Sequence, residues 1–227
     1  MHGFASNRSE NWNRLGWYGA FERKAIRFAA FDARGHGESA KPHDPADYAR
    51  EKMVDDVFAL MDHLGAARAD LLGYSMGARI VLAAALAQPE RVPMVIAGGI
   101  GGKLFDPAPP GNPMASAMEA DDPARIAEPL LRSFRQFADE QGEDRKALAA
   151  FSRAPHPAFT REMLAGLRVP TLIVAGARDE LAGDPGALAQ AIPGARAVIL
   201  PGCDHFSAIP HGLFKASVFD FLDGVLE

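Results

Sequence analysis

Short apolar segments alternate with longer helical patterns along most of the chain. We expect buried strands at RFAAFD (27–32), ADLLGYS (69–75), VPMVIAGGI (92–100), VPTLIVAG (169–176) and ARAVILPG (195–202). Helices are expected near residues 48–64, 76–87, 184–192 and 208–225. Strands that alternate with helices favour a mostly parallel sheet with helices on both faces, so the predicted fold class is α/β.

Three of these helices carry local signals of their own. The segment 48–64 has apolar residues on one face at helical spacing, and Gly65 is suited to end it. The alanine-rich segment 76–87 is apolar on most sides, which predicts deep burial. In the segment 184–192, Asp184 is the expected N-cap and Pro185 occupies the first turn.

The pattern changes between residues 101 and 168. This region holds the proline-rich stretches DPAPPGNP and APHPAF and helical pieces such as PARIAEPLLRSFRQFA, without a convincing strand. We therefore expect a core formed by residues 1–100 and 169–227, with residues 101–168 as a cap insertion over one edge of the sheet.

The motif Gly73-Tyr74-Ser75-Met76-Gly77 lies between an expected strand and an expected helix. A G-x-S-x-G nucleophile elbow requires this context, because the serine sits on a sharp, strained turn and only residues with little or no side chain fit two positions to either side. The Ser75 hydroxyl then projects above the sheet edge, and the Met76 amide points the same way at the start of a helix. Ser75 is therefore the candidate nucleophile.

A carboxylate and a histidine follow in the order Ser, Asp, His. Asp179 comes just after the expected strand TLIVAG, with Glu180 and Asp184 as rival acids. His205 lies in the loop PGCDHFS after the last expected strand, where it can take the serine proton and be oriented by Asp179. We expect packing for Cys203 and loop stabilisation for Asp204.

Together, GYSMG, DARGHGES, the strand-end Asp179 and the late GCDHF resemble the α/β-hydrolase superfamily, in its esterase/lipase-like and haloperoxidase-like branch. The resemblance covers essentially the whole chain and implies that His2-Gly3-Phe4 is an oxyanion turn. By this resemblance the Phe4 amide pairs with the Met76 amide to stabilise a tetrahedral oxyanion. DARGHGES would be a structural turn, and serine at the nucleophile position disfavours dehalogenase and epoxide hydrolase chemistry.

The same resemblance places a strand before His2-Gly3, between the strands expected at 27–32 and 69–75. The loss of a central strand would leave buried backbone groups unpaired. We therefore expect that Met1 is an internal methionine and that the working protein begins upstream. The rival interpretation is a shortened sheet whose gap closes or is filled by residues 9–26.

Composition narrows the function classes. The net charge of −5 offers no basic face to nucleic acid or anionic lipid, and no apolar run is long enough for a membrane span. The single cysteine suits a reducing cytoplasm, and no metal or cofactor motif is present. We expect a cytoplasmic enzyme with a small-molecule substrate and no cofactor; its oligomeric state stays open.

The expected activity is that of a serine carboxylesterase acting on small to medium apolar esters through an acyl-enzyme. Phe4, Met76 and Phe206 adjoin the catalytic parts and are expected to line the substrate site, with Tyr74 as a further candidate. The cap candidates, for which packing within the cap is the alternative, are Phe105, Met114, Met118, Phe134 and Phe137. Lactone, thioester or carbon–carbon bond hydrolysis by the same triad, and a non-catalytic binding module on the same fold, are the alternatives.

Overall fold

The computed structural model describes residues 1–226 and contains one four-stranded sheet. Its strands are β1 (Leu71–Tyr74), β2 (Val95–Gly98), β3 (Thr171–Gly176) and β4 (Arg196–Leu200), in the spatial order β1-β2-β3-β4. All three pairings are parallel, with Gly73 opposite Ala97, Ile96 opposite Leu172 and Val174 opposite Val198. The parallel sheet confirms the predicted α/β class.

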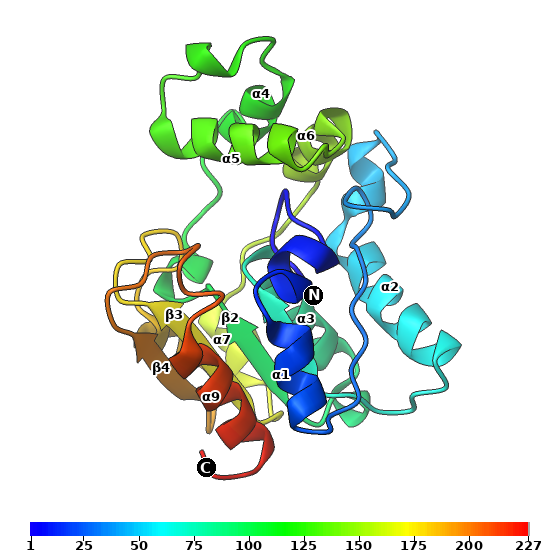
Figure 1. Cartoon of the computed structure of the whole chain (residues 1–227), viewed down its shortest axis with the longest axis vertical. Helices are drawn as coiled ribbons and strands as arrows, with labels where there is room; N and C mark the ends of the chain where they lie inside the picture. Colours follow the sequence, from blue (N-terminus) through cyan, green and yellow to red (C-terminus); the bar gives the residue numbers. More distant parts are fainter. Residues whose placement is uncertain (227) are drawn as a thin grey trace.

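Nine α-helices accompany the sheet in the described part of the chain (Figure 1). They are α1 (Trp17–Arg23), α2 (Arg50–His63), α3 (Met76–Ala87), α4 (Pro113–Glu119), α5 (Pro129–Glu140), α6 (Arg145–Arg153), α7 (Arg161–Ala165), α8 (Pro185–Ala189) and α9 (Gly212–Leu222). Shorter helical turns are η1 (Ser9–Asn13), η2 (Pro45–Tyr48), η3 (Pro89–Arg91), η4 (Gly102–Phe105) and η5 (Pro123–Arg125).

The helices form a layer on each face of the sheet because successive strand residues point to opposite sides. Val95, Ala97 and Ile173 pack in one cluster with residues of α2, α3, α7 and α8. Ile96 and Leu172 pack in the other cluster with residues of α1 and α9. Figure 1 shows α1 and α9 together on the near side of the sheet. This three-layer arrangement matches the prediction of helices on both faces.

The four strands expected from 69 onward are confirmed, but the strand expected at residues 27–32 is wrong. This segment joins no sheet, and Phe28 is 38 % exposed. Within residues 1–226, none of its backbone amides donates to a protein acceptor. Apolar content alone does not make a strand, because a strand also needs a neighbour to complete its hydrogen-bond ladder.

Met1 occupies the outer edge of β1 instead. Its terminal ammonium donates to the Leu72 carbonyl over 2.5 Å, and its carbonyl accepts from the Tyr74 amide over 3.0 Å. Burial lowers the pKa of this ammonium to about 5. Residues 9–26 do not add a strand; they form η1 and α1, which bring Trp12 and Trp17 onto the sheet face.

Two of the expected helices have later starts or earlier ends than predicted. Asp184 caps α8 by accepting from the Gly186 amide over 2.8 Å, as expected, but the helix ends at Ala189. The last helix begins at Gly212 and not near 208, because the His211 side chain accepts from the Leu213 amide and caps it. Gly65, with φ of +66°, follows the end of α2.

Residues 101–168 form helices, and no strand occurs there in the described chain. Helices α4, α5 and α6 lie together at one end of the molecule (Figure 1). They pack through a small apolar cluster that includes Met118, Phe134 and Leu148. In contrast, Leu104 of η4 and Leu164 of α7 belong to the cluster on the sheet face. Across residues 1–226, every helix is too short or too polar to span a membrane.

Candidate active site

Ser75 lies on the sharp turn between β1 and α3. Its backbone has φ of 53° and ψ of −110°, a conformation that costs energy for any residue except glycine. The turn closes only because the residues two positions before and after Ser75 are glycines, which lack side chains. A Cβ added to Gly73 would lie 2.4 Å from the carbonyl carbon of Gly77, and one added to Gly77 would lie 2.4 Å from the Met1 oxygen.

His205 connects this serine to a buried carboxylate. Its Nε2 atom lies 3.0 Å from the Ser75 hydroxyl oxygen, and its Nδ1 atom lies 2.8 Å and 3.0 Å from the two oxygens of Asp179. Because an ionised carboxylate can only accept, Nδ1 carries the proton and Nε2 accepts from the Ser75 hydroxyl. The arrangement can therefore move the serine proton onto the imidazole.

Asp179 is held in place by the backbone that follows β3. Its Oδ1 atom accepts from the amides of Leu181 (3.0 Å) and Ala182 (2.9 Å). The rival acids are used otherwise: Glu180 is exposed, and Asp184 caps α8. Asp204 accepts from the amides of Phe206 and Ser207 within its own loop.

The His2-Gly3-Phe4 turn lies directly beside Ser75. A Cβ added to Gly3 would be 3.6 Å from the Ser75 Cβ, and the Gly3 amide donates to Asn11 Oδ1 over 3.0 Å. His2 is fully buried and supports the turn from the other side. Its Nε2 atom accepts from the Ala33 amide and its Nδ1 atom donates to the Gly3 carbonyl, which requires the neutral ring. Burial also holds the pKa of His2 well below the usual value.

Two backbone amides at this point have no protein partner. Within the described chain, neither the Phe4 amide nor the Met76 amide donates to a protein acceptor. Met76 is the first residue of α3, where the helix dipole favours negative charge. The pair can therefore stabilise negative charge on the oxygen of a group that becomes attached to the Ser75 hydroxyl oxygen.

The predicted lining residues fall into two groups. Phe4 and Phe206 both contact Phe134 of α5: the ring centroid of Phe134 lies 6.0 Å from that of Phe4 and 5.7 Å from that of Phe206. Phe206 is 45 % exposed. The side chains of Tyr74 and Met76 are instead buried in the two core clusters. The Tyr74 hydroxyl donates to the His205 carbonyl over 2.5 Å, so this side chain contacts the backbone of His205 and not the space in front of Ser75.

Two residues near the site were missed from the sequence. Asn11, which holds the Gly3 amide, lies in an irregular turn without a recognisable motif. Glu143, between α5 and α6, accepts from Asn7 Nδ2 (3.2 Å) and from the Gly37 amide (2.9 Å), and so joins the α4–α6 group to the turns beside the triad. Burial raises the pKa of Glu143.

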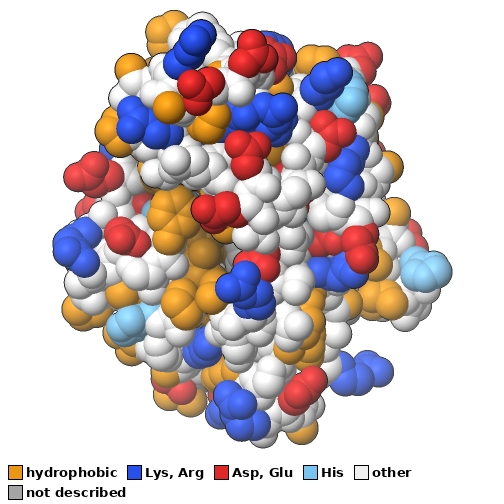
Figure 2. Space-filling view, turned by 45° about the horizontal axis from the view of Figure 1, so that its top comes forward, with side chains coloured by type: hydrophobic (Ala, Val, Ile, Leu, Met, Phe, Trp, Pro, Cys, Tyr) orange, Lys and Arg blue, Asp and Glu red, His pale blue; other side chains and the backbone are white. Residues whose placement is uncertain are grey.

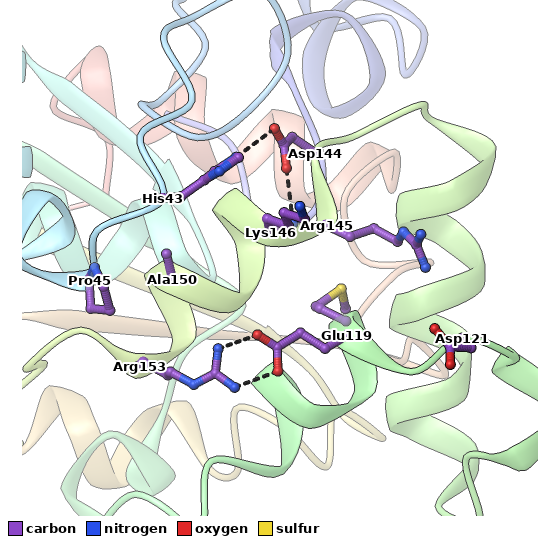
Figure 3. Close-up of a pocket in the computed structure, with 10 residues that line it drawn as sticks. His43, Pro45, Glu119, Asp121, Asp144, Arg145, Lys146, Ala150 and Arg153 are labelled. Carbon is purple, nitrogen blue, oxygen red and sulfur yellow. Dashed lines mark hydrogen bonds and ion pairs between the residues drawn. The ribbon is translucent and has the colours of Figure 1, made fainter.

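A separate cavity of about 850 Å³ lies among α4, α6 and residues 43–45, and Ser75 is not one of the residues that line it (Figure 3). Two of its charged side chains pair with each other, since Arg153 forms a two-pronged ion pair with Glu119. Nε2 of His43 lies 2.9 Å from Oδ2 of Asp144. Hydrophobic side chains gather beneath the charged top of the molecule (Figure 2). Among residues 1–226, no cluster of three His, Cys, Asp or Glu side chains could hold a metal ion.

Comparison with known proteins identifies similar chains. Residues 1–159 match the family model described as alpha/beta hydrolase fold. A dihydrolipoyllysine-residue acetyltransferase component of the acetoin cleaving system from Pseudomonas putida is 30 % identical over 90 % of this chain, which spans only 57 % of that relative. A 2-hydroxymuconate semialdehyde hydrolase from Pseudomonas sp. (strain CF600) is also 30 % identical, over 88 % of this chain and 77 % of the relative.

Among solved structures, the enol-lactonase from Burkholderia xenovorans LB400 superposes with a TM-score of 0.76 at 28 % identity. The match covers 98 % of this chain and 89 % of the lactonase. The nearly complete coverage includes both the sheet that carries Ser75 and the helices above it.

Proposed function

Because the chain belongs to the alpha/beta hydrolase fold family, we propose that it is a serine hydrolase that cleaves small to medium apolar carboxylic esters through an acyl-enzyme. The observation that carries this proposal is the hydrogen-bonded series Ser75, His205, Asp179, with the serine on a strained turn. A buried series of this kind, with two amides free beside it, is what acyl transfer requires.

In the proposed reaction, His205 Nε2 takes the proton from Ser75 as the serine oxygen attacks the ester carbonyl carbon. The carbonyl π electrons move onto oxygen, and the Phe4 and Met76 amides hold the resulting oxyanion. When the oxyanion collapses, the bond to the alcohol oxygen breaks and the imidazolium protonates that oxygen. Water then repeats the sequence on the acyl-enzyme, releasing the carboxylic acid and restoring Ser75.

Asp179 has two proposed tasks. Its contact with Nδ1 keeps the imidazole in the tautomer that leaves Nε2 free to accept, and its charge stabilises the imidazolium that forms. The amides of Leu181 and Ala182 hold the carboxylate in this orientation.

The surroundings of the triad favour uncharged acyl groups. Phe4, Phe134 and Phe206 form a connected aromatic group beside Ser75, and the partly buried residues packed on the neighbouring cluster include Met114, Phe137 and Leu181. Both described clusters next to the site are apolar, so a charged group would lose hydration there without gaining a partner. We propose that the core comprises residues 1–100 and 169–227 and that the cap lies within 101–168, with α4–α6 as its helices.

Lactone cleavage is the second candidate, because a lactone is a cyclic ester and needs the same three side chains. The similarity to the enol-lactonase supports it. The binding-module alternative is disfavoured, since a protein that only binds has no need to hold Ser75 in a strained conformation.

The proposal is tested by steady-state hydrolysis of p-nitrophenyl esters from acetate to octanoate and of an aliphatic lactone, with wild type and Ser75→Ala. We expect wild type to hydrolyse the short and medium esters and the variant to fall to the background rate. Absence of turnover on every ester and on the lactone, or full activity in Ser75→Ala, would contradict the proposal.

A further inference from the structure

Tyr74 joins the two halves of the triad through one hydrogen bond. It is the last residue of β1 and is covalently bonded to Ser75. Its hydroxyl donates to the backbone carbonyl of His205 over 2.5 Å, although 131 positions separate the two residues. The neighbour of the candidate nucleophile is thus attached to the backbone of the candidate base.

The Tyr74 ring occupies space that side chains at positions 98 and 99 would otherwise fill. Gly98 and Gly99 follow one another at the end of β2. A Cβ added to Gly98 would lie 2.8 Å from Tyr74 Cδ2, and one added to Gly99 would lie 2.6 Å from Tyr74 Cζ. The ring also packs against His205 and Phe214, with centroids 5.4 Å and 6.1 Å apart. A rigid ring enclosed in this way fixes the position of its hydroxyl.

The His205 loop has few other attachments near the imidazole. The Cys203 carbonyl accepts from the Arg178 amide over 2.8 Å, and the Ile209 carbonyl accepts from Trp17 Nε1 over 2.9 Å. Within residues 1–226, no donor other than Tyr74 reaches the His205 carbonyl. Burial raises the pKa of the Tyr74 hydroxyl well above its usual value, which favours the protonated form that donates this bond.

We propose that Tyr74 is a positioning residue for His205, which sets the distance between the imidazole Nε2 and the Ser75 oxygen by holding the histidine backbone. This inference rests on the proposed function of the triad. It differs from a general stabilising role because the bond connects the backbone of the base to the strand end that carries the nucleophile.

The chain contains a matched control in Tyr48. Tyr48 is also fully buried and donates its hydroxyl to a backbone carbonyl, that of Pro42, over 2.6 Å. That bond lies in the 42–48 segment and has no connection to the triad. The substitutions Tyr74→Phe and Tyr48→Phe therefore remove the same atom from similar surroundings.

The test compares kcat, KM and the rate of Ser75 phosphonylation by a fluorophosphonate in wild type and both variants, with thermal unfolding as the measure of structural loss. We expect comparable decreases in melting temperature, but a roughly 10- to 100-fold loss of kcat and of phosphonylation rate only in Tyr74→Phe, with KM nearly unchanged. Equal activity in the two variants, whether retained or lost, would overturn the inference. Wild type that reacts with neither ester nor fluorophosphonate would instead contradict the proposed function.

Discussion

The Nε2 atom of His205 lies 3.0 Å from the hydroxyl oxygen of Ser75, across 130 positions of sequence. Two separate local features of the backbone produce this distance. The glycines at 73 and 77 permit the strained serine turn, and the loop after β4 returns over the sheet edge to deliver the imidazole.

Replacement of Asp179 by asparagine tests the orientation of the imidazole. Asparagine can present its NH₂ group to Nδ1 and so favour the tautomer that carries the proton on Nε2, which cannot accept from Ser75. We expect kcat to fall by roughly 10³- to 10⁴-fold with little change in stability. Asp184→Asn is the control: it keeps a good N-cap on α8 and should leave kcat unchanged. Similar rates in both variants would place the acid elsewhere.

The proposed oxyanion role of the His2-Gly3-Phe4 turn can be tested through Asn11. Asn11→Ala leaves the Gly3 amide without the acceptor that now lies 3.0 Å away, so the Phe4 amide should lose its fixed direction. We expect kcat to fall by about tenfold or more, with KM nearly constant, because an oxyanion donor acts mainly in the transition state. Asn13→Ala, at an exposed position two residues on, should have wild-type kinetics. A change confined to KM would argue against the oxyanion role.

Phe206 is expected to contribute to substrate binding. Its ring is 45 % exposed and lies beside both Phe134 and His205, where an acyl or alcohol group would cover it. Phe206→Ala should raise KM for aryl and medium-chain esters about fivefold, the effect of about 1 kcal/mol of lost apolar contact, and change acetate esters little. Phe28→Ala removes a ring of similar exposure far along the chain from the triad and should not alter KM. Equal effects on acetate and octanoate esters would exclude this role.

His36, which is buried in its neutral form, should make the free energy of unfolding depend on pH. Burial lowers the pKa of His36 to about 4, whereas an unfolded histidine titrates near 6.5. Between these values only the unfolded chain takes up the proton, so stability is lost as pH falls from about 6.5 toward 4, by up to roughly 3 kcal/mol for this group.

His36→Asn provides the measurement. Asparagine can replace the Nδ1 donor that faces the Arg34 carbonyl but does not titrate. Urea unfolding at pH 7.5 and pH 5 should show a smaller loss of stability on acidification in the variant than in wild type. The same loss in both chains would mean that His36 does not contribute.

The parts of the fold that could be predicted from the sequence depend on local pattern. Strand β3 contains the apolar run LIVA (172–175) and α8 begins with its own cap, so each carries its signal within a few residues. The candidate triad was recognisable because each side chain follows a strand, and parallel strands bring their carboxyl ends to one edge. The segment 27–32 failed because strand formation depends on a partner that local composition does not reveal.

The direction of individual side chains was harder to predict. Tyr74 was expected to line the substrate site, whereas its ring lies in the cluster with Ile96 and Phe214 on one sheet face. The direction of the Tyr74 side chain could not be predicted from its position at the end of a strand, because the following Ser75 does not have strand geometry. Glu143 was likewise invisible, because its two partners lie more than 100 positions away in sequence.

The most direct test of the proposed serine hydrolase is covalent labelling with a fluorophosphonate, followed by mass spectrometry of the intact chain and its peptides. We expect one phosphonyl group per chain, located on Ser75, and none in Ser75→Ala or after substitution of His205 by alanine on the same time scale. A wild-type chain that takes up no label, or one labelled at a residue other than Ser75, would contradict it.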